Sequence, residues 1–181
     1  YMQFPGMVLA DTFMLNSERT LNFNNQIFFE NGIRASMQEQ ERITIIIGNP
    51  PYNVGKKIEK YPIDIRITET YAKKGRAANK KSLYDSYIRA IRWASDRIED
   101  RGVVCFVTNA SFIDGNSADG MRKCLAEEFS AIYIFNLRGN QRGGNWRAEG
   151  GKVFGEGSQL PIAITLFVKD GRNKRGECEI F

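Results

Sequence analysis

The sequence predicts an α/β protein with a mostly parallel sheet, because strand-like and helix-like segments alternate along the chain. Residues 43–48, 102–109 and 131–137 are apolar runs rich in β-branched and aromatic residues, as strands buried on both faces are. Residues 82–98 and 117–129 carry apolar residues at helical spacing and separate these runs. Strand, helix, strand, helix, strand at these lengths indicates right-handed crossovers and therefore parallel strands.

Capping residues and apolar stripes define the two helices. Ser82, with Asp85 three residues later, predicts where the first helix begins, and Gly102 marks its end. Ser117 is predicted to cap the second helix. The apolar stripes are Leu83, Tyr87, Ile91, Ala94 and Ile98 in the first helix and Met121, Leu125 and Phe129 in the second.

Shorter segments complete the expected order. A short strand over 6–13 and a helix over 34–42 precede the strand at 43–48. Residues 160–168 predict the last long strand. An Asp-Gly turn signal follows it, and residues 178–181 are compatible with a returning strand.

Length and composition indicate one globular domain or part of one. The chain has 181 residues, 42% of them hydrophobic and 26% charged. No apolar run approaches the length of a membrane span, and the amino end lacks the basic-then-apolar pattern of a signal peptide. We therefore expect a cytoplasmic protein with no membrane partner.

The absence of histidine narrows the chemistry. The sequence has no histidine, which removes the commonest general base, the usual zinc ligand and every histidine-containing triad. Cys105, Cys124 and Cys178 lack metal-ligand spacing, so they are predicted to be free thiols and no metal site is expected. Hydrolase functions are therefore disfavoured. A net charge of +5 suits a polyanionic partner.

A strand that stops abruptly carries the clearest functional signal. The run at 43–48 is followed by Asn49, Pro50, Pro51 and Tyr52. Each proline fixes φ and lacks an N–H, so the carbonyls of Asn49 and Pro50 are free to accept hydrogen bonds on a stiff turn. Ligands of open α/β sheets bind at this carboxyl edge of the strands.

These residue types suit the activation of an amine. The Asn49 amide oxygen and the Pro50 carbonyl can each accept one N–H of a planar NH2 group, which favours charge on that nitrogen as it attacks an electrophile. The Tyr52 ring offers a face for stacking. The motif is therefore predicted to make a poorly nucleophilic NH2 react. A proline-terminated strand without chemistry is the alternative.

Asn-Pro-Pro-Tyr after a β-rich strand resembles the catalytic motif of S-adenosyl-L-methionine-dependent amino-methyltransferases, above all the DNA adenine-N6 methyltransferases. Residues 48–55 and 82–139 are similar to the methylase segment of single-chain restriction-modification polypeptides that join nuclease, helicase and methyltransferase. The resemblance implies a Rossmann-like fold, S-adenosyl-L-methionine as cofactor and double-stranded DNA as partner. It also implies that Asn49 and Pro50 hold adenine N6 and that Tyr52 stacks on the flipped base.

The resemblance implies further contacts outside the motif. Asp11 and Phe13 stand where the family contacts the cofactor, although Asp11 can equally be a cap. The last strand is implied to insert antiparallel into the sheet, with an aromatic residue near its end against the flipped base. Phe167 has this place in the sequence, where an ordinary core phenylalanine fits as well.

Two basic segments are candidates for DNA contact. Residues 56–81 repeat lysine and arginine, and residues 138–159 combine glycines with cations. Both segments begin at the predicted ligand edge, where their cations can neutralise phosphates. Solvated connections are the alternative. The DNA-contacting residues predicted in the second segment are Arg138, Arg142 and Arg147.

The resemblance implies that residues 1–181 are the catalytic part of a methyltransferase domain within a larger polypeptide. The glycine-rich cofactor turn of the family has no counterpart upstream of Asp11, and a target-recognition region is expected after the catalytic part. The strands would lie in the family order fourth, fifth, seventh, sixth. The fourth would be an exposed edge, which predicts self-association. Methyl transfer by the isolated chain is not expected.

Two other functions stay open. The same four residues can hold any planar NH2 group, so RNA or a protein glutamine is an alternative substrate. A non-catalytic DNA-binding module is the second alternative, in which the basic loops matter and Asn49 does not.

Overall fold

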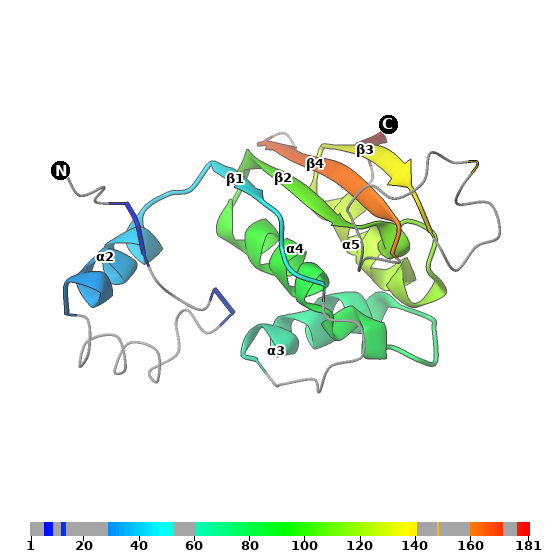
Figure 1. The fold of residues 1–181 in the computed structure, drawn as a ribbon, viewed down its shortest axis with the longest axis horizontal. Coiled ribbons are helices and arrows are strands. Elements are labelled where there is room, and N and C mark those ends of the chain that lie inside the picture. The colour runs from blue at the N-terminus through cyan, green and yellow to red at the C-terminus, as the bar shows by residue number, and fades with distance from the viewer. Residues whose placement is uncertain are drawn as a thin grey trace.

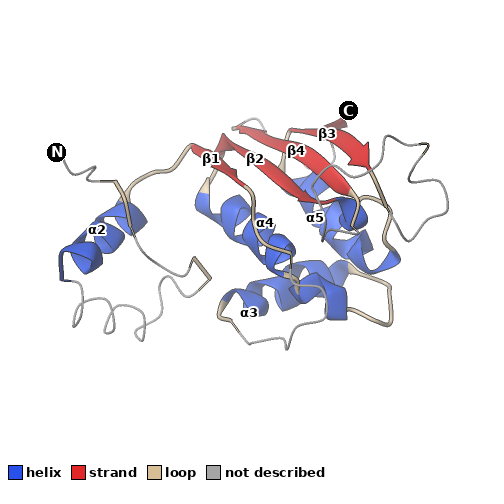
Figure 2. Cartoon of the chain, viewed as in Figure 1, coloured by secondary structure: helices blue, strands red, loops and turns tan. Residues whose placement is uncertain are grey.

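The computed structural model describes residues 6–8, 12–13, 29–52, 61–140, 148, 160–171 and 177–181. Within them, a five-stranded sheet carries helices against one face (Figure 1 and Figure 2). None of the helices in this part of the chain has the length and apolarity of a membrane span. The main elements are α2 (Phe29–Gln40), β1 (Ile45–Gly48), α3 (Ile63–Ile67), α4 (Ser86–Arg97), β2 (Arg101–Asn109), α5 (Asp119–Glu128), β3 (Ala131–Arg138), β4 (Ile162–Asp170) and β5 (Glu179–Ile180).

The sheet confirms the predicted class and strand order. Its order is β1-β2-β4-β3-β5. β1 pairs parallel with β2, and β3 pairs parallel with β5. β4 runs antiparallel to both β2 and β3, so it is the one strand of the described sheet that is reversed. β1 lies at the edge, as expected for the fourth strand of the family order.

The starts of the two main helices differ from the prediction. Asp85 occupies the N-cap position of α4, with φ −69° and ψ 146°. Ser82 lies instead in the 3-10 turn Lys81–Tyr84, and Ser117 lies in the 3-10 turn before α5. Their hydroxyls bond each other at 2.6 Å. The prediction that Ser82 and Ser117 cap these helices is therefore wrong, because their side chains bond each other and so join the two helix starts.

The amino-terminal segment also differs. Residues 6–8 and 12–13 are turn and irregular backbone, so the strand predicted over 6–13 is wrong wherever the structure describes it. The helix predicted over 34–42 is confirmed as α2, which begins earlier, at Phe29.

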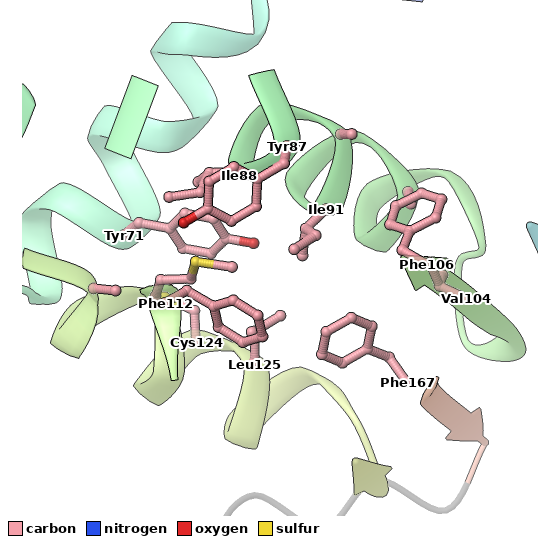
Figure 3. Close-up of a cluster of buried hydrophobic side chains, with 14 of the residues drawn as sticks. Tyr71, Tyr87, Ile88, Ile91, Val104, Phe106, Phe112, Cys124, Leu125 and Phe167 are labelled. Carbon is pink, nitrogen blue, oxygen red and sulfur yellow. The ribbon is translucent and has the colours of Figure 1, made fainter. Parts of the chain in front are cut away.

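The core lies between the sheet and the helix layer (Figure 3). Val104 and Phe106 of β2 and Phe167 of β4 face Ile91 of α4 and Leu125 of α5. Every residue of the two predicted apolar stripes is buried. The helical period in the sequence therefore identified the core-facing sides of α4 and α5.

Two arginines outside these stripes are buried as well. Arg92 is 2% exposed, and its guanidinium donates to both carboxylate oxygens of Glu128 at 2.8 Å and to Asp96 at 2.6 Å. Arg89 binds Asp64 with two bonds of 2.7 and 2.9 Å. These ion pairs tie α4 to α5 and α3, since buried charges require partners.

Candidate functional site

The Asn-Pro-Pro-Tyr motif lies at the carboxyl edge of the sheet. Gly48, the last residue of β1, stands opposite Phe106 of β2, so Asn49 follows level with Val107. Asn49 is exposed, Pro50 is buried and Tyr52 is half-buried. The chain leaves the sheet at the prolines, because they cannot donate to a ladder. This placement agrees with the strand-to-turn interpretation of the motif.

Tyr52 is held beside Asn49. Its hydroxyl donates to Asn49 Oδ1 at 3.2 Å, and the carbonyl oxygen of Val107 lies 3.4 Å from the same hydroxyl. Its ring meets the Tyr87 ring edge-on, with centroids 6.3 Å apart and planes at 83°. Burial raises the pKa of Tyr52, so its hydroxyl stays a donor at neutral pH. A fixed aromatic ring thus adjoins the amide oxygen that is predicted to accept from an amine.

Tyr87 supports the motif from the helix layer. It lies in the first turn of α4, is buried, and also contacts the Phe112 ring at 6.4 Å. Burial, followed by the charge of Asp85, raises its pKa. In the sequence, Tyr87 is recognisable only as a member of the apolar stripe that faces the core. The missed signal is a tyrosine in the first turn of a helix that begins at the edge where the motif ends.

The polar end of β2 lies at the same edge, but its Asn109 side chain already bonds the neighbouring backbone. Asn109 is buried, and its side chain accepts from the Ser111 backbone N–H at 2.9 Å. It thereby caps the 3-10 turn Ala110–Phe112. Thr108 is also buried, and its hydroxyl has no partner among the described residues. The structure therefore gives this tip a structural role beside the motif.

Arg138 lies at the same edge, on the far side of β4. It pairs with Ile162, which in turn pairs with Asn109. The backbone of Arg138 has φ +60°, and its side chain is exposed. Three strand spacings, or about 14 Å, separate Arg138 from β1. Residues 138–140, where this basic segment begins, thus leave the sheet at the motif edge, as predicted, while Arg142 and Arg147 lie outside the described residues.

The other basic segment is partly structural. Residues 61–81, its described part, contain α3 and the π-helix Thr68–Ala72. Lys74 pairs with Glu127 of α5, and Lys80 donates to the Ala72 carbonyl at 2.5 Å. At least two of its cations therefore stabilise the helix layer.

Phe167 lies away from this edge, which corrects its predicted contact with the substrate base. Because β4 is antiparallel, its beginning shares the edge with Asn109, whereas Phe167 pairs with Val104. Five residues of strand separate Phe167 from Ile162, or about 17 Å. Phe167 is 0% exposed and packs on Phe129, with ring centroids 5.3 Å apart. It is a core phenylalanine.

Of the two predicted cofactor contacts, the structure describes Phe13 but not Asp11. Asp11 lies outside the described residues. Phe13 lines a cavity of about 320 Å³ together with Trp93. The motif touches α4 at Tyr87, and Trp93 lies about 9 Å further along that helix. The roles of Asp11 and Phe13 as cofactor contacts therefore stay predictions.

Three solved structures resemble the chain over nearly its whole length. They are a nuclease-deletion mutant of the Type ISP restriction-modification enzyme LlaGI in complex with a DNA substrate mimic, the ATP-dependent Type ISP enzyme LlaBIII bound to DNA, and a DrdV–DNA complex. Their identities are 44%, 40% and 35%, with TM-scores of 0.86, 0.89 and 0.87. They cover 97%, 99% and 99% of this chain, which spans only 15%, 12% and 18% of theirs.

The comparison with models of protein families agrees with these structures. No curated protein sequence matches the chain. Residues 7–142, which include the motif, β1, β2, β3 and the helices between them, match the Eco57I restriction-modification methylase family. The chain therefore belongs to the Eco57I restriction-modification methylase family.

Proposed function

We propose that the chain is the catalytic segment of a site-specific DNA methyltransferase in a restriction-modification system, acting on N6 of a flipped adenine. The observation that carries the proposal is the position of Asn49 and Tyr52, joined by a 3.2 Å hydrogen bond at the carboxyl edge of β1. Family membership supports methylation, and the solved relatives LlaGI and LlaBIII are restriction-modification enzymes in complexes with DNA or its mimic.

The residues of this chain would act on the methyl acceptor. Adenine N6 is a weak nucleophile, because its lone pair is conjugated with the ring. Asn49 Oδ1 and the Pro50 carbonyl would accept its two N–H groups and stabilise the positive charge that develops on nitrogen. The Tyr52 hydroxyl uses only one lone pair of Asn49 Oδ1 and leaves the other for the amine. The methylated nitrogen would then release one proton to water, so this step requires no histidine.

The donor proposed for this family is S-adenosyl-L-methionine, which supplies an electrophilic methyl group when bound. Double-stranded DNA is the proposed partner. The half-buried Tyr52 ring offers a stacking face to a flipped base, an interaction of about 1–3 kcal/mol. Exposed Arg138 lies along the same edge, where it can neutralise a phosphate.

The test uses a polypeptide extended to the length of the solved relatives. It is incubated with labelled S-adenosyl-L-methionine and duplex DNA, and the DNA is digested to nucleosides. We expect label in N6-methyladenine. Asn49→Ala is expected to lower the rate at least about 100-fold, the usual effect of removing one charge-stabilising hydrogen bond, while DNA affinity is largely kept. Gln40→Ala is the control, because Gln40 is an exposed carboxamide at the end of α2, before β1 begins and outside both basic segments.

Equal rates for Asn49→Ala and the parent would refute the assignment. Label in RNA or in a protein glutamine, with none in DNA, would keep the chemistry and replace the substrate. No methyl transfer to any acceptor, together with lost DNA affinity in Arg138→Ala, would favour the binding module instead.

A further inference from the structure

Arg122 is bound to the loop that follows β2. It lies in the first turn of α5, and its Nη1 donates to the carbonyl oxygens of Phe112 and Gly115 at 2.8 and 2.9 Å. The side chain is half-buried, and the bonds that it makes within the described part of the chain go to these backbone carbonyls. One nitrogen therefore ties the end of the 3-10 turn Ala110–Phe112 to the start of the 3-10 turn Asn116–Ala118.

The place of Arg122 runs against the charge preference of a helix. A cation in the first turn meets the positive end of the helix dipole, which is unfavourable. The acid of that turn, Asp119, accepts from the Arg76 backbone N–H at 2.9 Å and pairs with Lys123 at 3.6 Å. Charge-assisted hydrogen bonds to the two loop carbonyls offset the cost. Arg122 therefore stabilises the loop rather than its own helix.

The loop is tightly wound where Arg122 holds it. The Gly115 N–H donates to the Ser111 carbonyl at 3.0 Å, and a Cβ on Gly115 would stand 2.4 Å from that carbonyl oxygen. Asn109 caps the beginning of the loop through the Ser111 N–H. The middle of the loop, residues 112–115, is thus fixed from α5 by the guanidinium.

This loop reaches the motif through packed rings. The Phe112 ring is 2% exposed and lies 6.4 Å from the Tyr87 ring, which meets the Tyr52 ring at 6.3 Å. Phe112 and Tyr87 both belong to the core cluster (Figure 3). Close-packed side chains transmit a displacement to their neighbours. A shift of the loop would therefore change the seat of the Tyr52 ring.

We infer that Arg122 is a positioning residue for the motif. By holding Phe112 against Tyr87, it sets the angle of the Tyr52 ring. The Tyr52 hydroxyl bonds Asn49 Oδ1, so a rotated ring also displaces the amide that is proposed to accept from adenine N6. The effect on the reaction rests on the proposed function, whereas the orientation of the ring can be measured without methyl transfer.

Kinetics of the extended polypeptide test the effect on the reaction. Arg122→Met keeps the apolar stem and removes the donors, and kcat is expected to fall at least about 10-fold, because a misplaced acceptor slows the chemical step. KM for DNA should stay unchanged, since no contact with bound DNA is removed. Arg122→Lys keeps a charged donor and should return part of kcat. Lys123→Met is the matched control, because it removes an exposed cation from the next residue of α5 and should change neither constant.

Fluorine NMR follows the ring itself. Incorporation of 3-fluorotyrosine in place of Tyr52 alone gives the extended polypeptide one resonance, whose chemical shift depends on the adjoining Tyr87 ring. Arg122→Met is expected to move or broaden this resonance, and Arg122→Lys to move it less. Lys123→Met should leave it unchanged. Thermal melting identifies any variant that does not fold, and if Arg122→Met does not, Arg122→Lys carries the comparison.

Three results would overturn the inference. One is the parental kcat together with the parental resonance in folded Arg122→Met. Another is a lower kcat with the parental resonance, which would show that the arginine acts by a route other than the Tyr52 ring. The third is a raised KM for DNA with an unchanged kcat, which would make Arg122 a DNA contact. Failure of the proposed function would be seen separately, as no methyl transfer by the parent, and the resonance alone would then decide the inference.

Discussion

Replacing Phe167 with alanine tests both the core and the place of this ring in the fold. Phe167 is 0% exposed, and its ring lies against Phe129 at 5.3 Å with planes at 41°. Truncation leaves a cavity between β4 and the helix layer, which costs about 3–5 kcal/mol for a buried phenylalanine. Loss of the aromatic pair places the expected value near the middle of this range, about 4 kcal/mol.

Urea unfolding followed by circular dichroism measures this loss. With an m-value of about 2 kcal/mol/M, the midpoint should fall by about 2 M. Phe135→Ala is the control, because the Phe135 side chain is 66% exposed and its truncation is expected to lower the free energy of unfolding of the isolated chain by less than about 1 kcal/mol. A loss below about 1 kcal/mol for Phe167→Ala, with a raised KM for DNA in the extended enzyme, would refute the core assignment and restore the contact with the base.

Three further substitutions test the helix layer by urea unfolding. The buried Tyr71 hydroxyl has no partner among the described residues and burial raises its pKa, so Tyr71→Phe should stabilise by about 1 kcal/mol at pH 7. The free energy of unfolding of the parent should also fall as the pH rises above about 10, the pKa of an unfolded tyrosine, because only the unfolded state then releases the Tyr71 proton. The Tyr71→Phe variant should lose less stability over the same pH range. Glu128→Ala removes two of the bonds of buried Arg92 and should cost about 3 kcal/mol, and an unchanged midpoint would contradict the buried ion pair. Gly120→Ala should destabilise by about 1–3 kcal/mol, since a Cβ would stand 2.4 Å from the Gly75 nitrogen; a gain of about 1 kcal/mol would mean that helix propensity outweighs this contact.

Local patterns were sufficient to predict much of this protein. The apolar run before Gly48 and the two prolines after Asn49 act on their own backbone, so strand, stop and turn appear where the sequence places them. The stripes on α4 and α5 follow the helical period, and the buried faces follow from it.

Long-range partners decided the features that were predicted wrongly or missed. The hydroxyls of Ser82 and Ser117 look like caps in sequence, but each is the other's partner across two helix starts. Arg92 is buried because Glu128, far along the chain, supplies its counter-charge. Neither pairing leaves a signal within a single segment.

The sequence by itself determined the α/β class, the core stripes and the motif at the end of β1, because backbone propensity and side-chain periodicity act over a few residues. Only the tertiary structure decided that Phe167 packs on Phe129 in the core, away from the motif edge. Only the tertiary structure brought Tyr87 against Tyr52 and left large apolar side chains of the sheet, such as Phe135, exposed among the described residues. The physical reason is that side-chain contacts between elements and the packing of layers join residues far apart in the chain, which no local pattern records.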